Sequence, residues 1–166
     1  MNYCLIIIGY IVNIIKQFNT IALREYKTYL VKKRINPNIG HIGGTTIWNN
    51  IDRIHIGDNT YINGAELLTT EDSQIIIGKN CLISYDVVFR TDMHNHEIAK
   101  PIIEQGNTSN DIIIGDNIWI GHGAYIMPGV TIGNNSIIGT KAVVTKDIPA
   151  NSVAVGIPAK VIKTRE

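Results

Sequence analysis

The sequence has few cysteines and lacks the spacings that give cysteines a structural role. Cys4 and Cys81 are the only two among 166 residues. Two cysteines so far apart provide neither a disulfide framework nor a metal-ligand motif, and they fit a reducing compartment. The sequence also has no basic stripe with interleaved aromatic residues, and its formal net charge is +1. Nucleic acid is therefore a poor candidate partner.

A long hydrophobic run is also missing. The most apolar stretch, from Cys4 to Ile15, is interrupted by Gly9, Tyr10 and Asn13. It is too short to span a bilayer, and it has neither a basic segment before it nor a small-residue cleavage site after it. We therefore expect neither a transmembrane helix nor a secretion signal.

A repeat of six residues is what the sequence has instead. Six aliphatic residues recur at this interval: Ile114, Ile120, Ile126, Ile132, Ile138 and Val144. Glycine directly follows four of them. Mostly small or branched residues stand four positions after each one: Ile118, Ala124, Val130, Ser136, Ala142 and Ile148. This period matches neither a strand nor a helix, so the chain must turn a corner in every unit.

Two earlier series keep the same interval. Ile56, Ile62 and Leu68 form one, and Ile77, Ile83 and Phe89 form the other. The spacing predicts a parallel β-solenoid in which each coil buries its aliphatic residues against the next. Corner positions that need positive φ favour glycine or asparagine, and the candidates are Asn59, Asn80, Asn117, Asn134 and Asn135. The rhythm stops between Arg90 and Asp111, which predicts a protruding loop at 90–111.

The first 36 residues follow a different pattern. Apolar residues from Ile11 to Leu30 recur at intervals of three and four, which predicts an amphipathic helix of about twenty residues ending before Asn36-Pro37. Six basic residues stand here against a single acid, Glu25. We therefore divide the chain into an N-terminal helical segment, 1–36, and a solenoid domain with a C-terminal tail, 37–166. The helix either covers a solenoid end or another subunit, or it anchors the protein on an anionic membrane surface.

The motifs of the solenoid resemble those of a known family. Ile114-Gly-Asp-Asn-Ile-Trp-Ile-Gly121, Pro128-Gly-Val-Thr-Ile-Gly133 and Val155-Gly-Ile-Pro-Ala-Lys-Val-Ile162 are similar to segments of the bacterial hexapeptide-repeat O-acetyltransferases. The likeness covers roughly residues 50 to 163 and is closest to the branch that acts on sugars and surface polysaccharides. It implies a left-handed parallel β-helix, a homotrimer, and acetyl-CoA as the co-substrate, bound in the groove between adjacent subunits, with no metal required.

The resemblance also implies the residues that act on the acceptor. In this family a histidine on the protruding loop is the general base, which fits His94, with His96 in reserve. Trp119 matches the tryptophan that lines the site. Chemistry supports such a residue independently, because an imidazole is suited to removing a proton from a sugar hydroxyl at neutral pH. Asp92 or Glu97 would orient the ring or stabilise the imidazolium. Arg90 and Tyr85 are candidate acceptor contacts, although a loop-anchoring hydrogen bond is the simpler role for Arg90.

Cofactor contacts carry over by position in the same way. Residues near the pantetheine arm would be Gly121, His122, Gly139 and Thr140, and residues near the adenine and phosphates would be Thr145, Lys146, Lys160 and Lys163. Lysine is a suitable partner for the phosphates of CoA because its charge sits on a flexible stem. The simpler alternative for each lysine is ordinary solvation of a polar C-terminus.

Other functions remain open on this fold. An amino-sugar N-acetyltransferase is one, although many of these enzymes carry a further N-terminal α/β domain. A zinc-dependent γ-type carbonic anhydrase is another; it would need a second histidine five residues after His122, where this chain has Met127. A scaffold without catalysis is the third. The expected location is the cytoplasm, with peripheral association at the inner membrane face if the helix is an anchor.

Overall fold

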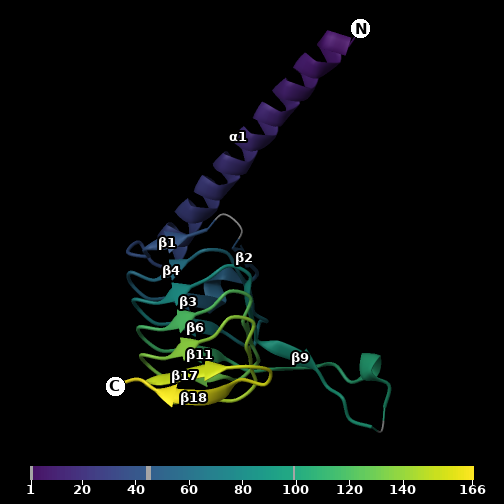
Figure 1. The fold of residues 1–166 in the computed structure, drawn as a ribbon. Coiled ribbons are helices and arrows are strands. Elements are labelled where there is room, and N and C mark those ends of the chain that lie inside the picture. The colour runs from purple at the N-terminus through teal and green to yellow at the C-terminus, as the bar shows by residue number, and fades with distance from the viewer. Residues whose placement is uncertain (1, 44–45, 99) are drawn as a thin grey trace.

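The computed structural model describes residues 2–43, 46–98 and 100–166. A long N-terminal helix, α1 (Asn2–Arg34), leads into a stack of short parallel strands (Figure 1). The stack has three sheets that wrap one interior, and successive strands pass from sheet to sheet. The fold is a left-handed parallel β-helix, as the repeat and the family resemblance predicted.

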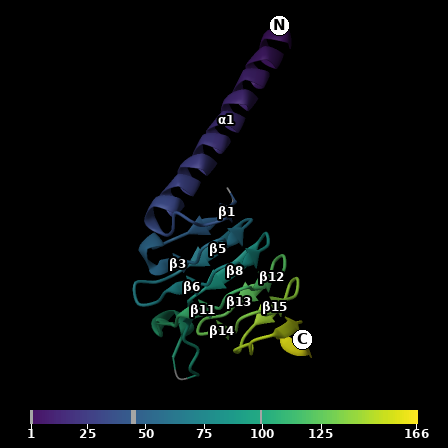
Figure 2. The same cartoon turned by 90° about the vertical axis from the view of Figure 1, so that its left-hand side faces the viewer.

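The strands fall into columns that follow the coils (Figure 2). The seven-stranded sheet contains β1 (His41–Ile42), β4 (Tyr61–Ile62), β7 (Leu82–Ile83), β12 (Trp119–Ile120), β15 (Ile137–Ile138), β17 (Ser152–Val155) and β18 (Lys160–Thr164). The five-stranded sheet contains β2 (Ile47–Trp48), β5 (Ala65–Leu68), β8 (Val87–Arg90), β13 (Tyr125–Ile126) and β16 (Val143–Val144). The four-stranded sheet contains β3 (Ile54–Ile56), β6 (Ile75–Ile77), β11 (Ile112–Ile114) and β14 (Thr131–Ile132).

The remaining elements lie outside these columns. A hairpin is formed by β9 (Asp92–His94) and β10 (Asn107–Ser109), and short 3₁₀ turns occur at η1 (Ile51–Arg53) and η2 (Ile102–Glu104). The last strand, β18, runs antiparallel to β17, unlike the other neighbours in its sheet.

The six-residue aliphatic series forms the core, as predicted. Every member from Ile114 to Val144 is at most 1% exposed, and the residues four positions after them are buried too. Parallel pairing places equivalent residues above one another; for example, Ile77 pairs with Ile114, which pairs with Ile132. The interior is therefore a stack of aliphatic side chains that runs along the solenoid.

One core position was predicted wrongly. Leu67 is 1% exposed and faces the interior, whereas Leu68 is only half-buried. In β5 the inward residues are Ala65 and Leu67, so the interval after Ile62 is five residues. The strand alternates its side chains between two faces, so this shift of one residue turns Leu68 away from the core. The later series of Ile77, Ile83 and Phe89 is buried as predicted.

Asparagines occupy one corner and connect the coils to each other. Asn59, Asn80, Asn117 and Asn135 have φ between 57° and 62°, the left-handed conformation predicted for corner residues. Their side chains form amide ladders: Asn117 Nδ2 donates to Asn135 Oδ1 at 2.9 Å. Asn134 lies beside this corner without positive φ, and its Oδ1 accepts from the backbone N–H of Asp116 at 2.9 Å.

Helix α1 is longer than expected. It spans 33 residues because the apolar stretch from Cys4 to Ile15 continues the same helix. This stretch has no proline to interrupt the backbone hydrogen bonds. Val31, near the end of the helix, is fully buried and packs on the solenoid core.

Candidate active site

The protruding loop predicted at 90–111 is a braced hairpin. Strand β8 ends at Arg90 in the five-stranded sheet, and β11 begins at Ile112 in the four-stranded sheet. Between them, β9 and β10 pair in antiparallel fashion and project sideways from the solenoid (Figure 1). The chain thus leaves the solenoid at a corner between two sheets and returns to it without disturbing the stack of coils.

The base of the hairpin is tied to the preceding coil on both sides. The buried hydroxyl of Thr91 lies 2.6 Å from that of Ser73, and Thr91 Oγ1 also donates to the carbonyl of Leu68 at 3.2 Å. On the returning side, the carboxylate of Asp111 accepts from both the backbone and the side-chain amide of Gln74, each at 2.9 Å. These bonds fix the direction in which the hairpin leaves the solenoid.

His94 lies at the end of β9 and is exposed. Asn107 is its partner across the hairpin. Residues Asp92 and His94 are two positions apart on one strand, so their side chains share a face. An imidazole on this face is accessible to a substrate, as a general base requires.

The carboxylate of Asp92 is engaged by residues other than His94. Its Oδ1 accepts from Arg90 Nε at 3.0 Å, and its Oδ2 accepts from Asn107 Nδ2 at 2.9 Å. We predicted that Asp92 or Glu97 would orient the imidazole or stabilise the imidazolium, and this role stays a prediction. In this structure Asp92 joins the two strands of the hairpin, and Arg90 has the loop-anchoring contact that was the alternative to acceptor binding.

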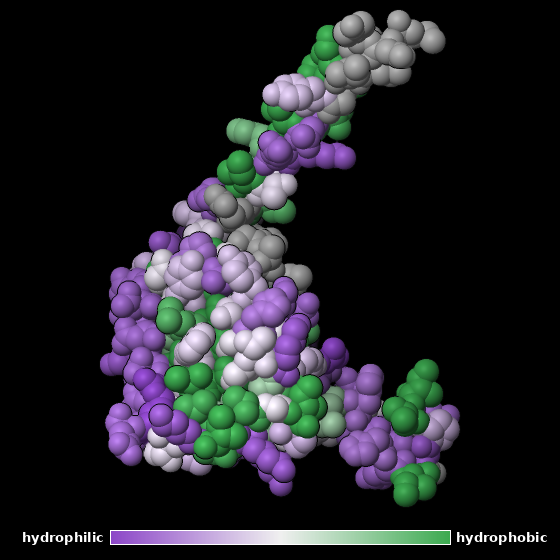
Figure 3. Space-filling view, in the orientation of Figure 1, coloured by the Kyte–Doolittle hydropathy of each residue, from purple (hydrophilic) through white to green (hydrophobic). Residues whose placement is uncertain are grey.

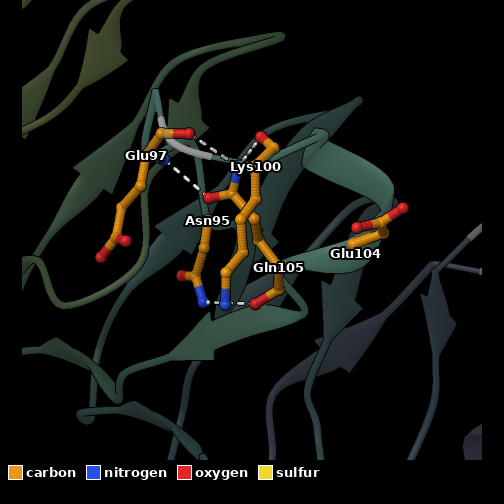
Figure 4. A pocket seen from close by; sticks show the side chains of 5 residues that line it. All are labelled: Asn95, Glu97, Lys100, Glu104 and Gln105. Carbon is orange, nitrogen blue, oxygen red and sulfur yellow. Dashed lines mark hydrogen bonds between the residues drawn. The ribbon is translucent and has the colours of Figure 1, made fainter.

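His96 lies farther out, near the hairpin tip. It lines a hollow of about 420 Å³ together with Asn95, Glu97 and Ile98. A neighbouring hollow is bordered by Gln105, whose Nε2 donates to the carbonyls of Glu97 and Lys100 at 2.8 and 2.6 Å (Figure 4). The side chain of Glu104 points away from this group (Figure 4). Gln105 thus stabilises the tip.

Apolar side chains are exposed at the same tip. Ile98, Ile102 and Ile103 have exposed fractions of 104%, 57% and 92%. Figure 3 shows hydrophobic atoms at the end of the projection. Large exposed apolar groups on a projection are typical of a contact with another molecule.

Trp119 lies on a different part of the surface. It is on β12 in the seven-stranded sheet, with Leu82 and Ile137 as its neighbours on adjacent strands. Its exposed fraction is 51%, and that of Leu82 is 55%. The hairpin leaves from the corner between the other two sheets, so a single chain does not place Trp119 beside His94.

Candidate cofactor residues line the corner that follows the seven-stranded sheet. His122 and Thr140 are exposed one coil apart, and Tyr85 is exposed one coil before His122. His122 Nε2 lies 3.7 Å from Asp86 Oδ2.

Gly121, another cofactor candidate, is buried, and a Cβ there would come within 2.6 Å of the backbone nitrogen of Thr140. At Gly139, a Cβ would meet Val155 Cγ1 at 2.7 Å. Both glycines are therefore needed for close packing of coils.

The other cofactor candidates lie elsewhere. Thr145 and Lys146 are exposed just after β16, at the corner from which the hairpin leaves two coils earlier in the stack. Lys160 and Lys163 are exposed on β18, at the C-terminal edge of the seven-stranded sheet. The predicted set thus occupies three places on one chain.

Several residues of the hairpin were not predicted from the sequence. Asn107, Gln105 and the Ser73–Thr91 pair hold the hairpin, yet none belongs to a repeat or a local motif. Their partners lie 5 to 18 residues away in the sequence. Within the described part of the chain, no group of three or more His, Cys, Asp or Glu side chains is placed to hold a metal ion.

Comparison with known proteins is consistent with this arrangement. The profile described as "Bacterial transferase hexapeptide (six repeats)" matches residues 111–146. The galactoside O-acetyltransferase of Escherichia coli K12 is 46% identical over 113 residues, which are 66% of this chain and 53% of that protein. The putative lipopolysaccharide biosynthesis O-acetyl transferase WbbJ of the same organism is 34% identical over 120 residues, covering 66% of this chain and 60% of that one.

A solved structure extends the likeness. A galactoside acetyltransferase in complex with coenzyme A superposes with a TM-score of 0.72 at 37% identity, covering 83% of this chain and 69% of that one. The matched region spans only about half the length of the first curated relative. With its repeats, its fold and these relatives, the chain belongs to the hexapeptide-repeat acetyltransferase family.

Proposed function

We propose that this protein transfers an acetyl group from acetyl-CoA to a hydroxyl group of a sugar. The observation that carries the proposal is His94, exposed on a hairpin that hydrogen bonds hold in one direction. The related proteins named above include a galactoside O-acetyltransferase and a homologous structure in complex with coenzyme A. Their names supply the donor and the class of acceptor.

The reaction is a direct transfer in a ternary complex. His94 removes the proton of the sugar hydroxyl as its oxygen attacks the thioester carbonyl carbon. The C–S bond then breaks, the thiolate of CoA leaves, and the imidazolium returns the proton to that sulfur. The step needs no enzyme nucleophile, and backbone N–H groups at coil corners are suited to stabilise the oxyanion.

The working unit in this proposal is a homotrimer, with the site between adjacent subunits. The separation of the hairpin from Trp119 within one chain supports this arrangement, because a neighbouring copy can bring its own Trp119 sheet to the hairpin. The apolar strip of Tyr61, Leu82 and Trp119, and the apolar hairpin tip, provide surfaces for such contacts. Acetyl-CoA would then contact the exposed corner residues His122 and Thr140, and lysines such as Lys160 and Lys163.

The acceptor we favour is a surface polysaccharide or its precursor, of the capsule or O-antigen type. The likeness to WbbJ, whose name refers to lipopolysaccharide biosynthesis, supports this choice. The reaction would then take place in the cytoplasm, where acetyl-CoA is made.

The test is release of free CoA from acetyl-CoA in the presence of neutral, amino and acidic sugars. We expect turnover with the wild type and a loss of about 10²- to 10⁴-fold in kcat for His94→Ala, the usual range for a general base. His96→Ala is the matched control, since it removes an imidazole two residues away on the same hairpin. Turnover that survives in His94→Ala and disappears in His96→Ala would assign the base to His96. No CoA release with any acceptor would contradict the proposed activity.

A further inference from the structure

Helix α1 is exposed over most of the length for which the structure describes the side chains. The last turn is docked: Val31 is buried, and Asn36 Nδ2 just beyond the helix donates to the carbonyl of Ile56 at 3.1 Å. From Ile7 to Leu23, every helix residue whose side chain the structure describes is exposed. Figures 1 and 2 show the helix extending well beyond the first coil.

One face of this exposed helix is apolar. Ile7, Ile11, Ile14, Phe18 and Ile21 follow one another at intervals of four and three, so they share one side. Their exposed fractions lie between 49% and 71%. The opposite side carries the polar residues Asn13, Lys16 and Thr20 together with the apolar residues Val12 and Leu23. Covering a large apolar side chain stabilises a protein by about 1.5–3 kcal/mol, so this face requires a partner.

The charge of the segment identifies the chemistry of that partner. Residues 1–36 contain six Lys or Arg and one acid, and three of the basic residues, Lys32, Lys33 and Arg34, end the helix. A bundle of identical helices would bring these like charges together. An anionic lipid surface would instead attract every copy, by about 1 kcal/mol for each basic residue near it.

The pattern of the apolar face also argues against a bundle. If the spacing of Ile7 to Ile21 continued as a coiled-coil seam, the next two seam positions would be Glu25 and Thr28. The apolar seam thus covers about two heptads, fewer than the three to four that indicate a coiled coil. Tyr10, Tyr26 and Tyr29 are exposed on the same helix, and tyrosine favours the membrane–water interface.

We propose that α1 binds the surface of an anionic lipid bilayer and lies within the headgroup region. Its apolar face enters the bilayer to the depth of the acyl-chain boundary, while Lys16 and the basic helix end contact lipid phosphates. No helix in the described parts of the chain is long and apolar enough to cross a membrane. The proposal concerns a binding surface at the N-terminal end of the solenoid, and it is independent of the acetyl-transfer site.

Flotation of the full-length protein with lipid vesicles tests the proposal. Vesicles of phosphatidylcholine alone are compared with vesicles of phosphatidylcholine and phosphatidylglycerol mixed at roughly 3:1, which have an anionic surface. We expect binding to the anionic vesicles that weakens as salt rises. Phe18→Glu should weaken this binding by at least about tenfold. Gln17→Glu adds the same charge to the neighbouring polar side and should change binding by less than about threefold.

Two further measurements make the test decisive. Replacing Lys32 and Lys33 with Gln should weaken binding to anionic vesicles by about thirtyfold and leave binding to neutral vesicles unchanged. The wild-type protein failing to float with anionic vesicles would overturn the proposal, as would equal losses for Phe18→Glu and Gln17→Glu. A smaller oligomer mass for Phe18→Glu in lipid-free solution, measured by analytical ultracentrifugation, would also overturn it, because it would show that another copy of the chain covers this face.

Discussion

Asn107 donates from Nδ2 to Asp92 Oδ2 at 2.9 Å, and its backbone lies directly opposite His94 across the hairpin. The two side chains therefore connect β9 to β10 beside the proposed base. A hydrogen bond to a charged group contributes about 1.5–3 kcal/mol. The loss of this one would let the two strands move relative to each other.

We expect Asn107→Ala and Asp92→Ala each to lower kcat by about tenfold, through the position of His94. The double variant should be no slower than Asp92→Ala alone, because Asp92→Ala already removes the contact with Asn107. The measurement is the CoA-release assay with a thermal unfolding control. Additive losses would show instead that Asp92 acts on the imidazole independently of Asn107.

The buried hydroxyls of Ser73 and Thr91 lead to a stability prediction. Thr91→Val keeps the shape of the side chain and removes its bonds to Ser73 and Leu68, so it should lower the free energy of unfolding by about 1–3 kcal/mol. Urea denaturation at fixed protein concentration measures this. Thr108→Val on exposed β10 is the control and should cost less than about 1 kcal/mol; equal costs would mean that the buried pair has no special role.

Glycines in the corner that follows the seven-stranded sheet should differ in their tolerance of a methyl group. At Gly121 the added Cβ meets backbone atoms of Thr140 and Gly139, whereas at Gly139 it meets the side chain of Val155. A side chain can move and the stacked backbone cannot. Gly121→Ala should therefore destabilise by about 1–3 kcal/mol or more, and Gly139→Ala by less. Thermal unfolding of the two variants gives the comparison, and the reverse order would contradict this account of the packing.

Burial raises the pKa of the Cys81 thiol, whose Sγ donates to the carbonyl of Gly115 at 3.2 Å. As pH rises, the thiol of the unfolded chain ionises first, close to the ordinary value of 9.0. The stability that Cys81 contributes is therefore complete below that pH and is lost as pH rises through the folded-state value.

This difference is measurable in a Cys4→Ser background. The folded protein should resist thiol labelling at neutral pH and react once it is unfolded. Its free energy of unfolding should fall more steeply above about pH 9 than that of a variant that also carries Cys81→Ala. Parallel pH profiles for the two proteins would contradict this, because they would show that folding does not change the pKa of the Cys81 thiol.

The periodic part of the fold could be predicted because each coil repeats the same local requirement. Ile120, Ile138 and their equivalents are buried in the same way in every coil. The interval of six residues in the sequence therefore indicates the buried positions directly. Leu67 escaped prediction because the corner between β4 and β5 is one residue shorter than the equivalent corner between β7 and β8. Periodicity cannot tell which of two adjacent leucines faces inward at such a break.

The site was predictable only as a set of residue types. His94 and Trp119 stood out because one lies in the only long interruption of the repeat and the other at an outward position. The contacts of Asp92 with Arg90 and Asn107 depend on the register of a hairpin, which no local pattern in the irregular loop encodes. The length of α1 was underestimated because the uncharged apolar stretch before Lys16 shows no polar face of its own.

The antiparallel strand β18 has a consequence for how these solenoids behave in solution. A parallel solenoid ends in strands with unpaired backbone groups, onto which another copy could add as one more coil. Here β18 pairs with β17. In the turn before β18, the backbone N–H of Ala159 donates to the carbonyl of Val143 in β16, the edge strand of the five-stranded sheet. The new outer edge runs in the wrong direction for another parallel coil and carries Lys160 and Lys163. Strand β18 therefore protects this edge of the seven-stranded sheet against the addition of a further parallel coil from another chain.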